Sequence, residues 1–273
     1  MTAEYLMAGQ ASELERLQLQ SRVWEPSGRS HLAQLPSGAG LRAVDVGCGA
    51  LGWLRILSEW AGPSGSVVGT DINREMLAAA RSFVEAESLP KVELVEDDLF
   101  ASALPAGSFD LVHARFQLAP IGRAPEQLAS YRRLIRPAGW LVLEEPDAAS
   151  WRFNPPAQAS ERLIGLVIDA FRAGGGDFDA GRSLREHLMG LGIDPTLTAQ
   201  VLALPPGHPY LRLPLQFAAS LAPRIEQITG SDALASLRAD AEAELADPSR
   251  WGTTFTLIQA CGQLPDRTAG AAP

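Results

Sequence analysis

The sequence has few of the features that mark secreted, membrane or nucleic-acid-binding proteins. Cysteine is scarce, since 273 residues include only Cys48 and Cys261, far apart, and neither a disulfide framework nor metal-ligand spacing is present. Two such thiols indicate a reducing compartment. No apolar run is long enough to span a membrane, and no basic start followed by an apolar stretch marks a signal peptide. We therefore expect a cytoplasmic protein without a bound metal.

Positive charge is also in the minority. The chain has 23 Lys and Arg against 32 Asp and Glu, which gives a net charge of −9. A nucleic-acid backbone or an anionic membrane surface requires a basic face, so both are disfavoured as partners. We expect a small-molecule substrate and a monomer or homodimer.

What is present is an ordinary soluble composition and a regular alternation of elements. Hydrophobic residues make up 46% of the chain and charged residues 20%, which is enough for a core of normal size. Short apolar segments alternate with helical patterns, and this alternation is typical of a doubly wound parallel sheet. The strands are expected at residues 43–46, 66–70, 92–95, 109–114 and 140–145.

The pattern changes after Pro146. Helices are expected over Ala157–Ala173, Tyr210–Gln227 and Asp232–Ala246, and strands over Thr196–Leu204 and Thr253–Ala260. We expect these two strands to pair antiparallel at the edge of the sheet. The helices would then cover one end of it.

A glycine-rich turn follows the first strand, in the sequence DVGCGALG from Asp45 to Gly52. The spacing Gly47-x-Gly49-x-x-Gly52 lets backbone approach a ligand, and the helix that follows presents free N–H groups. This spacing alone also fits a nicotinamide dinucleotide. However, Asp45 would repel a pyrophosphate at this place, whereas it could pair with a ligand ammonium.

Acidic residues also end the next two strands. Asp71 follows the second strand at the distance at which an acid binds both ribose hydroxyls. Asp97 and Asp98 end the third strand. Three neighbouring strand ends with carboxylates predict a pocket for a ligand that has a cationic end, a ribose and an adenine amine.

With these motifs the chain resembles the class I S-adenosylmethionine-dependent methyltransferases related to the quinone-biosynthesis enzymes. DVGCGALG resembles the first motif of that family, although Leu51 stands where a glycine is usual. GTDIN (69–73) resembles the ribose motif and VEDDLF (95–100) the adenine motif. SFDLVHAR (108–115) and YRRLIRPAGWLVLEEPD (131–147) resemble the fourth and fifth strand regions. The likeness covers about the first half of the chain.

The resemblance implies a seven-stranded Rossmann-like sheet, S-adenosyl-L-methionine as cofactor and a set of site residues. The parts would be N-terminal lid or cap helices (1–35), a cofactor-binding core (36–150), substrate-side helices with the last two strands (151–265) and a tail (266–273). The implied cofactor contacts are Tyr5, Gln20, Asp45, Gly47, Cys48, Gly49, Asp71, Ile72, Asp98, Leu99 and His113.

The N-terminal segment allows two interpretations. Helical patterns extend to Trp24 and again over His31–Leu35. The resemblance implies a lid in which Tyr5 and Gln20 touch the cofactor, but the same amphipathic pattern fits a helix that only caps the sheet.

The reacting groups are less well defined. His113 is a candidate general base, or a structural histidine bonded to backbone. Substrate contacts are expected from Arg115, Phe116, Trp151 and His208. We predict methyl transfer to an oxygen, nitrogen or carbon atom of a small, apolar secondary metabolite.

Three alternatives remain at this point. The first is an enzyme that binds the same cofactor but catalyses a cyclisation, rearrangement or decarboxylation. The second is a nicotinamide-dependent oxidoreductase, and the third is a cofactor-binding scaffold without turnover.

Overall fold

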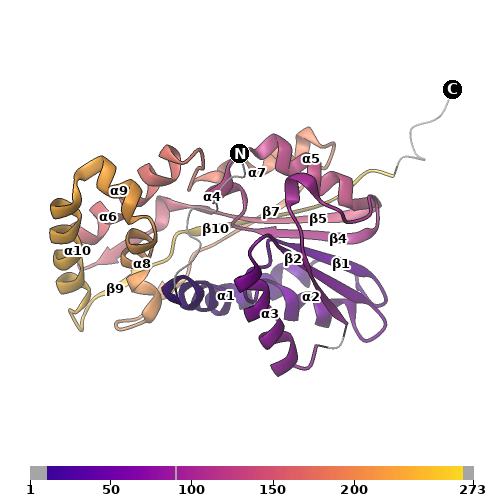
Figure 1. Cartoon of the computed structure of the whole chain (residues 1–273), viewed down its shortest axis with the longest axis horizontal. Helices are drawn as coiled ribbons and strands as arrows, with labels where there is room; N and C mark the ends of the chain where they lie inside the picture. Colours follow the sequence, from indigo (N-terminus) through magenta and orange to yellow (C-terminus); the bar gives the residue numbers. More distant parts are fainter. Residues whose placement is uncertain (1–10, 90, 267–273) are drawn as a thin grey trace.

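The computed structural model describes residues 11–89 and 91–266 and is built on one mixed sheet of seven strands (Figure 1). These strands are β1 (Arg42–Val46), β2 (Ser66–Asp71), β3 (Val92–Glu96), β4 (Phe109–Arg115), β5 (Ile135–Asp147), β7 (Thr196–Gln200) and β10 (Thr256–Gln263). Five of them are parallel in the order β3-β2-β1-β4-β5. β10 follows antiparallel to β5, and β7 lies at the edge, antiparallel to β10. The expected fold class, with its antiparallel C-terminal strand, is confirmed.

Helices cover both faces of this sheet. These are α1 (Ala11–Leu32), α2 (Leu54–Ala61) and α3 (Arg74–Ala86) on one side, and α4 (Leu118–Ile121), α5 (Ala124–Leu134) and α7 (Leu184–Gly190) on the other (Figure 1). Because both faces are covered, β1 and β2 can be apolar along most of their length. A second group lies beyond one end of the sheet and consists of α6 (Gln158–Ala173), α8 (Leu213–Ser220), α9 (Ala222–Thr229) and α10 (Ser231–Leu245) (Figure 1).

α1 is one continuous helix where the sequence suggested two. It runs through Pro26 without ending, and it brings Trp24 and His31 into fully buried positions. Burial of these side chains against the rest of the fold outweighs the helix-breaking tendency of proline.

The two predicted C-terminal strands each divide in two. The chain bends at Thr254, whose hydroxyl accepts from N of Leu202 while its own N–H donates to the Leu202 carbonyl. The outer pieces form a separate three-stranded sheet in the order β6-β9-β8, which the sequence pattern did not reveal. Its strands are β6 (Arg152–Asn154), β8 (Ala203–Leu204) and β9 (Trp251–Thr253).

The helix predicted over Tyr210–Gln227 is also interrupted. It divides at Leu221 into α8 and α9, because Pro223 favours the first turn of a new helix. Within the described residues, no helix is both long and apolar enough to cross a membrane.

Candidate active site

The chain turns sharply after β1, and three glycines make this turn possible. Gly47 and Gly49 have φ angles of +65° and +55°, which side chains with a Cβ rarely adopt. A Cβ on Gly47 would lie 2.2 Å from Nε2 of Gln117, and one on Gly52 would lie 2.2 Å from Oδ2 of Asp45. The motif glycines therefore provide both the turn and the space for a carboxylate beneath it.

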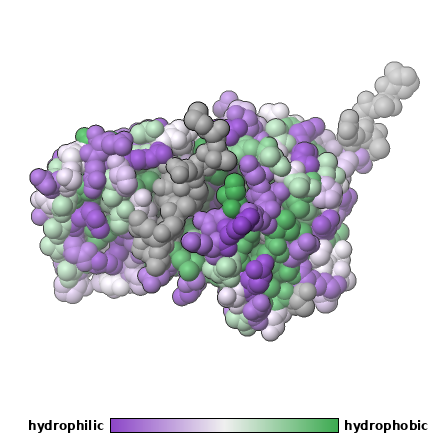
Figure 2. Space-filling model, in the orientation of Figure 1, coloured by the Kyte–Doolittle hydropathy of each residue, from purple (hydrophilic) through white to green (hydrophobic). Residues whose placement is uncertain are grey.

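A cavity of about 640 Å³ opens beside this turn. In Figure 2, apolar side chains (green) reach the surface next to strongly hydrophilic ones (purple) where the two halves of the molecule meet. The predicted cofactor contacts within the described residues all contribute to the cavity wall: Gln20, Asp45, Gly47, Cys48, Gly49, Asp71, Ile72, Asp98, Leu99 and His113. Tyr5 lies outside the described residues.

Asp71 is fixed by backbone N–H groups at the end of β2. Its Oδ2 accepts from N of Gly49 at 2.9 Å and its Oδ1 from N of Asn73 at 2.8 Å. Burial raises the pKa of Asp71, and these two hydrogen bonds act against that rise. Each oxygen retains lone-pair capacity, so the carboxylate can accept a pair of hydroxyl groups. Ile72, which follows it, is 51% exposed and offers an apolar surface beside them.

Asp98 occupies the matching place after β3. Its Oδ1 accepts from N of Phe100 at 2.9 Å and begins the short helix Leu99–Ala101. Cys48 packs beneath the turn, where burial and the nearby Asp45 and Asp71 carboxylates raise the pKa of its thiol well above the ordinary value. This thiol is therefore protonated and unreactive at neutral pH.

Asp45 is engaged within the protein. It is 1% exposed, its Oδ2 accepts from N of Trp53 at 2.6 Å, and its Oδ1 lies 2.7 Å from Nδ1 of His113. The two residues are partners in the β1–β4 register, which the sequence alone could not align. Nε2 of His113 lies 3.3 Å from Oε2 of Glu144, and Trp53 stacks on the imidazole at 3.8 Å.

His113 does not have the geometry of a general base. It is fully buried, and burial alone lowers its pKa, but the carboxylates of Asp45 and Glu144 outweigh that effect and raise it. A carboxylate at each nitrogen favours the protonated imidazole, which works against the removal of a proton from a substrate. Both ring nitrogens of His113 face side chains rather than backbone.

Glu145 supports the segment that faces the glycine turn. It is 1% exposed, and its carboxylate accepts the N–H groups of Gln117, Leu118 and Ala119 at 2.7 to 3.0 Å. Burial raises its pKa to about 7 despite these three hydrogen bonds. Strand-end acids are usually solvated, so no local pattern indicated this arrangement.

The far end of the cavity is aromatic. Phe116, predicted as a substrate contact, lines it together with four phenylalanines that no motif identified: Phe171, Phe178, Phe217 and Phe255. Their rings meet edge to face, with centroids 5.3 to 5.9 Å apart. These residues come from distant segments, so only the tertiary fold could bring them together.

The remaining substrate predictions divide into one inside and two outside the cavity. Arg115 lines the cavity, whereas Trp151 lies behind the aromatic wall, stacked on Phe178 at 5.6 Å. His208 is used locally, because its Nδ1 accepts from N of Tyr210 and begins a short helix. Neither Trp151 nor His208 lies in the cavity wall, so a contact of either residue with a substrate stays a prediction.

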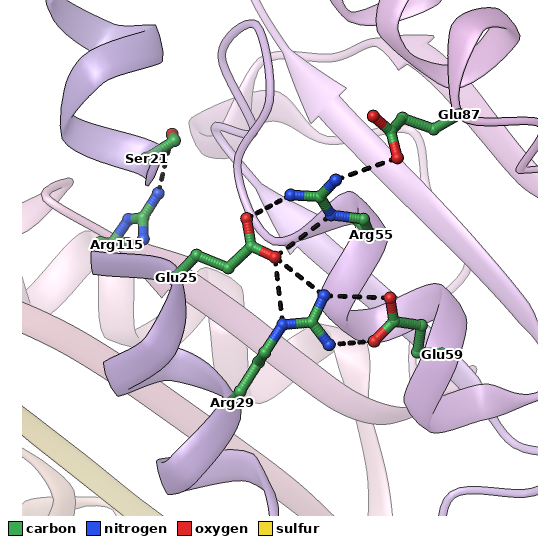
Figure 3. Close-up of polar contacts among 7 residues, drawn as sticks. All are labelled: Ser21, Glu25, Arg29, Arg55, Glu59, Glu87 and Arg115. Carbon is green, nitrogen blue, oxygen red and sulfur yellow. Dashed lines mark hydrogen bonds and ion pairs between the residues drawn. The ribbon is translucent and has the colours of Figure 1, made fainter. Parts of the chain in front are cut away.

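α1 also contributes to the wall of the cavity. Arg16 and Gln20 both line it, and Nη1 of Arg16 donates to Oε1 of Gln20 at 2.8 Å. Farther along α1, ion pairs join this helix to α2, and Arg55 of α2 in turn pairs with Glu87 at the end of α3 (Figure 3). The residues of this network are Glu25, Arg29, Arg55, Glu59 and Glu87. The C-terminal half of α1 is thus held against α2 by ion pairs.

Comparison with known proteins adds to this geometry. Residues 43–139 match a family model described as a methyltransferase domain. This segment contains the glycine turn, the three strand-end acids and the start of β5, so the resemblance to class I methyltransferases is confirmed for this part of the chain.

Two curated relatives extend the match. The chain is 33% identical over 151 residues to a nocamycin O-methyltransferase from Saccharothrix syringae, which covers 54% of this chain and 52% of the relative. It is 30% identical over 116 residues to a demethylmenaquinone methyltransferase from Listeria welshimeri, with 41% and 49% covered. The match thus spans about half the length of each of these relatives.

A solved structure covers more of the chain. A SAM-dependent methyltransferase from Aquifex aeolicus superimposes with a TM-score of 0.55 over 94% of this chain and 99% of that one, at 16% identity. At such low identity the similarity supports the fold alone, over 94% of this chain.

Proposed function

We propose that this protein is an S-adenosylmethionine-dependent methyltransferase that acts on a small, largely apolar secondary metabolite. The observation that carries the proposal is that the glycine turn, the acids of neighbouring strand ends and the aromatic chamber all line the same cavity. The matched methyltransferase domain and the O-methyltransferase relative from Saccharothrix support it.

The residues at the turn fit this cofactor. Asp71 would accept both ribose hydroxyls, Ile72 would pack on the adenine, and Asp98 would accept its amino group. Gly47 and Gly49 leave the turn without side chains, so backbone can contact the amino-acid part. When bound, the cofactor supplies an electrophilic methyl group on a cationic sulfur.

The chain contributes mainly position and exclusion of water. The phenylalanine chamber would hold an apolar substrate against the turn and remove solvent from the reacting atoms. Since both nitrogens of His113 are engaged, this residue is not available to remove a proton. The nucleophile is therefore expected to be acidic enough to react as its anion or to need no deprotonation.

Calorimetry with S-adenosylhomocysteine tests the cofactor assignment, and NAD⁺ is the control. We expect saturable binding of the first and none of the second. Binding of NAD⁺ alone would support the oxidoreductase alternative and overturn the proposal. Release of S-adenosylhomocysteine with a panel of phenols and carboxylic acids then tests methyl transfer. Turnover of a substrate without that release would indicate a non-methylating reaction.

A further inference from the structure

Arg115 has a buried donor without an acceptor. Its side chain is 7% exposed at the end of β4, and it lines the cavity. Nη2 donates to Oγ of Ser21 on α1 at 3.0 Å (Figure 3), but Nη1 has no hydrogen-bond partner among the residues that the structure describes. An unsatisfied buried donor is costly, so such a group in a binding cavity indicates an acceptor that arrives with a ligand.

The nearest carboxylate does not satisfy this donor. Oε2 of Glu144 lies 3.9 Å from Nη1, too far for a hydrogen bond. Glu144 is directed toward other partners, because Oε2 faces Nε2 of His113 and Oε1 accepts from Nε2 of Gln259. Nη1 of Arg115 is therefore available to another acceptor.

The local charges permit an added anion. The carboxylates of Asp45 and Glu144 face Arg115 and the imidazole of His113, whose pKa they raise, so basic groups already stand opposite both acids. The bond to Ser21 fixes the plane of the guanidinium, which reduces the entropy that a ligand contact would cost. Phe116, with its ring centroid 5.7 Å from Cζ, supplies an apolar boundary that strengthens a charged hydrogen bond.

We propose that Arg115 is a carboxylate anchor of this cavity, with Nη1 donating to a carboxylate oxygen of a bound ligand. The inference rests on the proposed function, which offers two sources for that group. One is the amino-acid carboxylate of the cofactor, and the other is an acidic group on the substrate. Either source pairs Nη1 with an anion at a place where no acceptor from residues 11–89 or 91–266 lies within hydrogen-bond distance.

The first pair of probes isolates the cofactor carboxylate. S-Adenosylhomocysteine carries the amino-acid end, whereas 5′-methylthioadenosine lacks it and keeps the ribose and adenine. Calorimetry measures the affinity of both nucleosides for the wild type and for Arg115→Met, a variant of similar length without charge. If the cofactor is the source, we expect the affinity for S-adenosylhomocysteine to fall at least about tenfold in the variant, while that for methylthioadenosine is unchanged.

The second pair isolates a substrate acid. 2-Naphthoate and 2-naphthamide share one aromatic body and differ in charge, and both are titrated into the complex with S-adenosylhomocysteine. If the substrate is the source, the wild type binds the acid at least about tenfold more tightly than the amide, and Arg115→Met removes this preference. Arg74→Gln is the matched control. It removes one positive charge from an exposed arginine paired with Glu96, so neither preference should change.

The outcomes separate the two proposals. A wild type that binds neither nucleoside refutes the proposed function and the anchor with it. A wild type that binds both nucleosides, but shows no dependence of either preference on Arg115, refutes the anchor alone. Arg115→Lys guards against misfolding of the methionine variant, since it keeps the charge and is expected to retain part of the preference.

Discussion

Replacement of Glu145 by glutamine tests the electrostatics of the segment that faces the glycine turn. The folded protein buries this carboxyl completely, and its pKa rises from an ordinary 4.5 to about 7. The unfolded chain exposes the same group to water. Between pH 4.5 and 7 the folded state therefore holds a proton that the unfolded state has released.

This difference makes the stability fall as the pH rises. In that window the folded state binds more protons, so each added pH unit favours unfolding. A rise of the Glu145 pKa from 4.5 to about 7 corresponds to roughly 3 kcal/mol of the free energy of unfolding, which is lost between about pH 4.5 and 7. Glu145→Gln cannot ionise, so the variant lacks this loss.

Urea unfolding of both proteins at pH 5 and pH 8 measures the effect. At pH 5 we expect the variant to be less stable by about 1–3 kcal/mol, because an amide nitrogen cannot accept the N–H of Ala119. At pH 8 the difference should shrink or reverse by roughly 3 kcal/mol. The same difference at both pH values would refute the reasoning.

Glu244→Gln is the matched control for this experiment. Glu244 likewise accepts the N–H groups of two residues at a helix start, Ala159 and Ser160, at 2.9 Å each. Burial opposes ionisation of Glu244, but its hydrogen bonds prevail and its pKa lies below the ordinary value. Its contribution is lost only as the pH falls below about 4.5, so the cost of this substitution should be equal at pH 5 and pH 8.

Three further predictions follow from the contacts. Asp71→Ala should weaken S-adenosylhomocysteine binding by at least about 1.5 kcal/mol in calorimetry, and an unchanged affinity would contradict the ribose assignment. His113→Gln should lower the free energy of unfolding, measured with urea, more at pH 5.5 than at pH 9. The pKa of His113 is raised in the folded state, so its stabilising contribution is complete below pH 6.5, the pKa in the unfolded chain, and is lost as the pH rises through the folded pKa. A cost that does not depend on pH would show that the imidazole is neutral. Trp24→Ala should lower the free energy of unfolding by about 3–5 kcal/mol, since this buried ring packs at 5.3 Å on Phe255 and donates to the hydroxyl of Tyr210 at 3.0 Å; a loss below about 1 kcal/mol would mean that α1 is not part of the core.

Local pattern was enough to predict the sheet. Apolar runs ended by glycine and proline located the parallel strands, and the edge pair Thr196–Leu204 and Thr253–Ala260 was placed correctly as antiparallel neighbours. The bend at Thr254 was missed because it depends on a hydrogen bond to Leu202, some fifty residues away in sequence. Contacts of that kind leave no local signature.

The candidate site divides in the same way. The glycine turn and the strand-end acids follow chain order, so their common location could be deduced from a parallel sheet. The engagement of His113 depends on the register of β1 against β4 and on Glu144 from a third strand. The aromatic chamber draws on four distant segments, and His208 is taken by a local cap, so neither could be inferred from spacing.

The polar chain behind the site ties the two halves of the molecule together. Gln259 on β10 donates to Glu144, accepts from Thr198 on β7, and through that hydroxyl reaches Nδ1 of His31 at 3.4 Å. The antiparallel pair of β7 and β10 therefore cannot be exchanged independently of the rest of the sheet. A chimera that takes β7 and β10 from a relative would need a glutamine and a hydroxyl residue in register with Glu144. Without them, Oε1 of Glu144 would be buried without a hydrogen-bond donor.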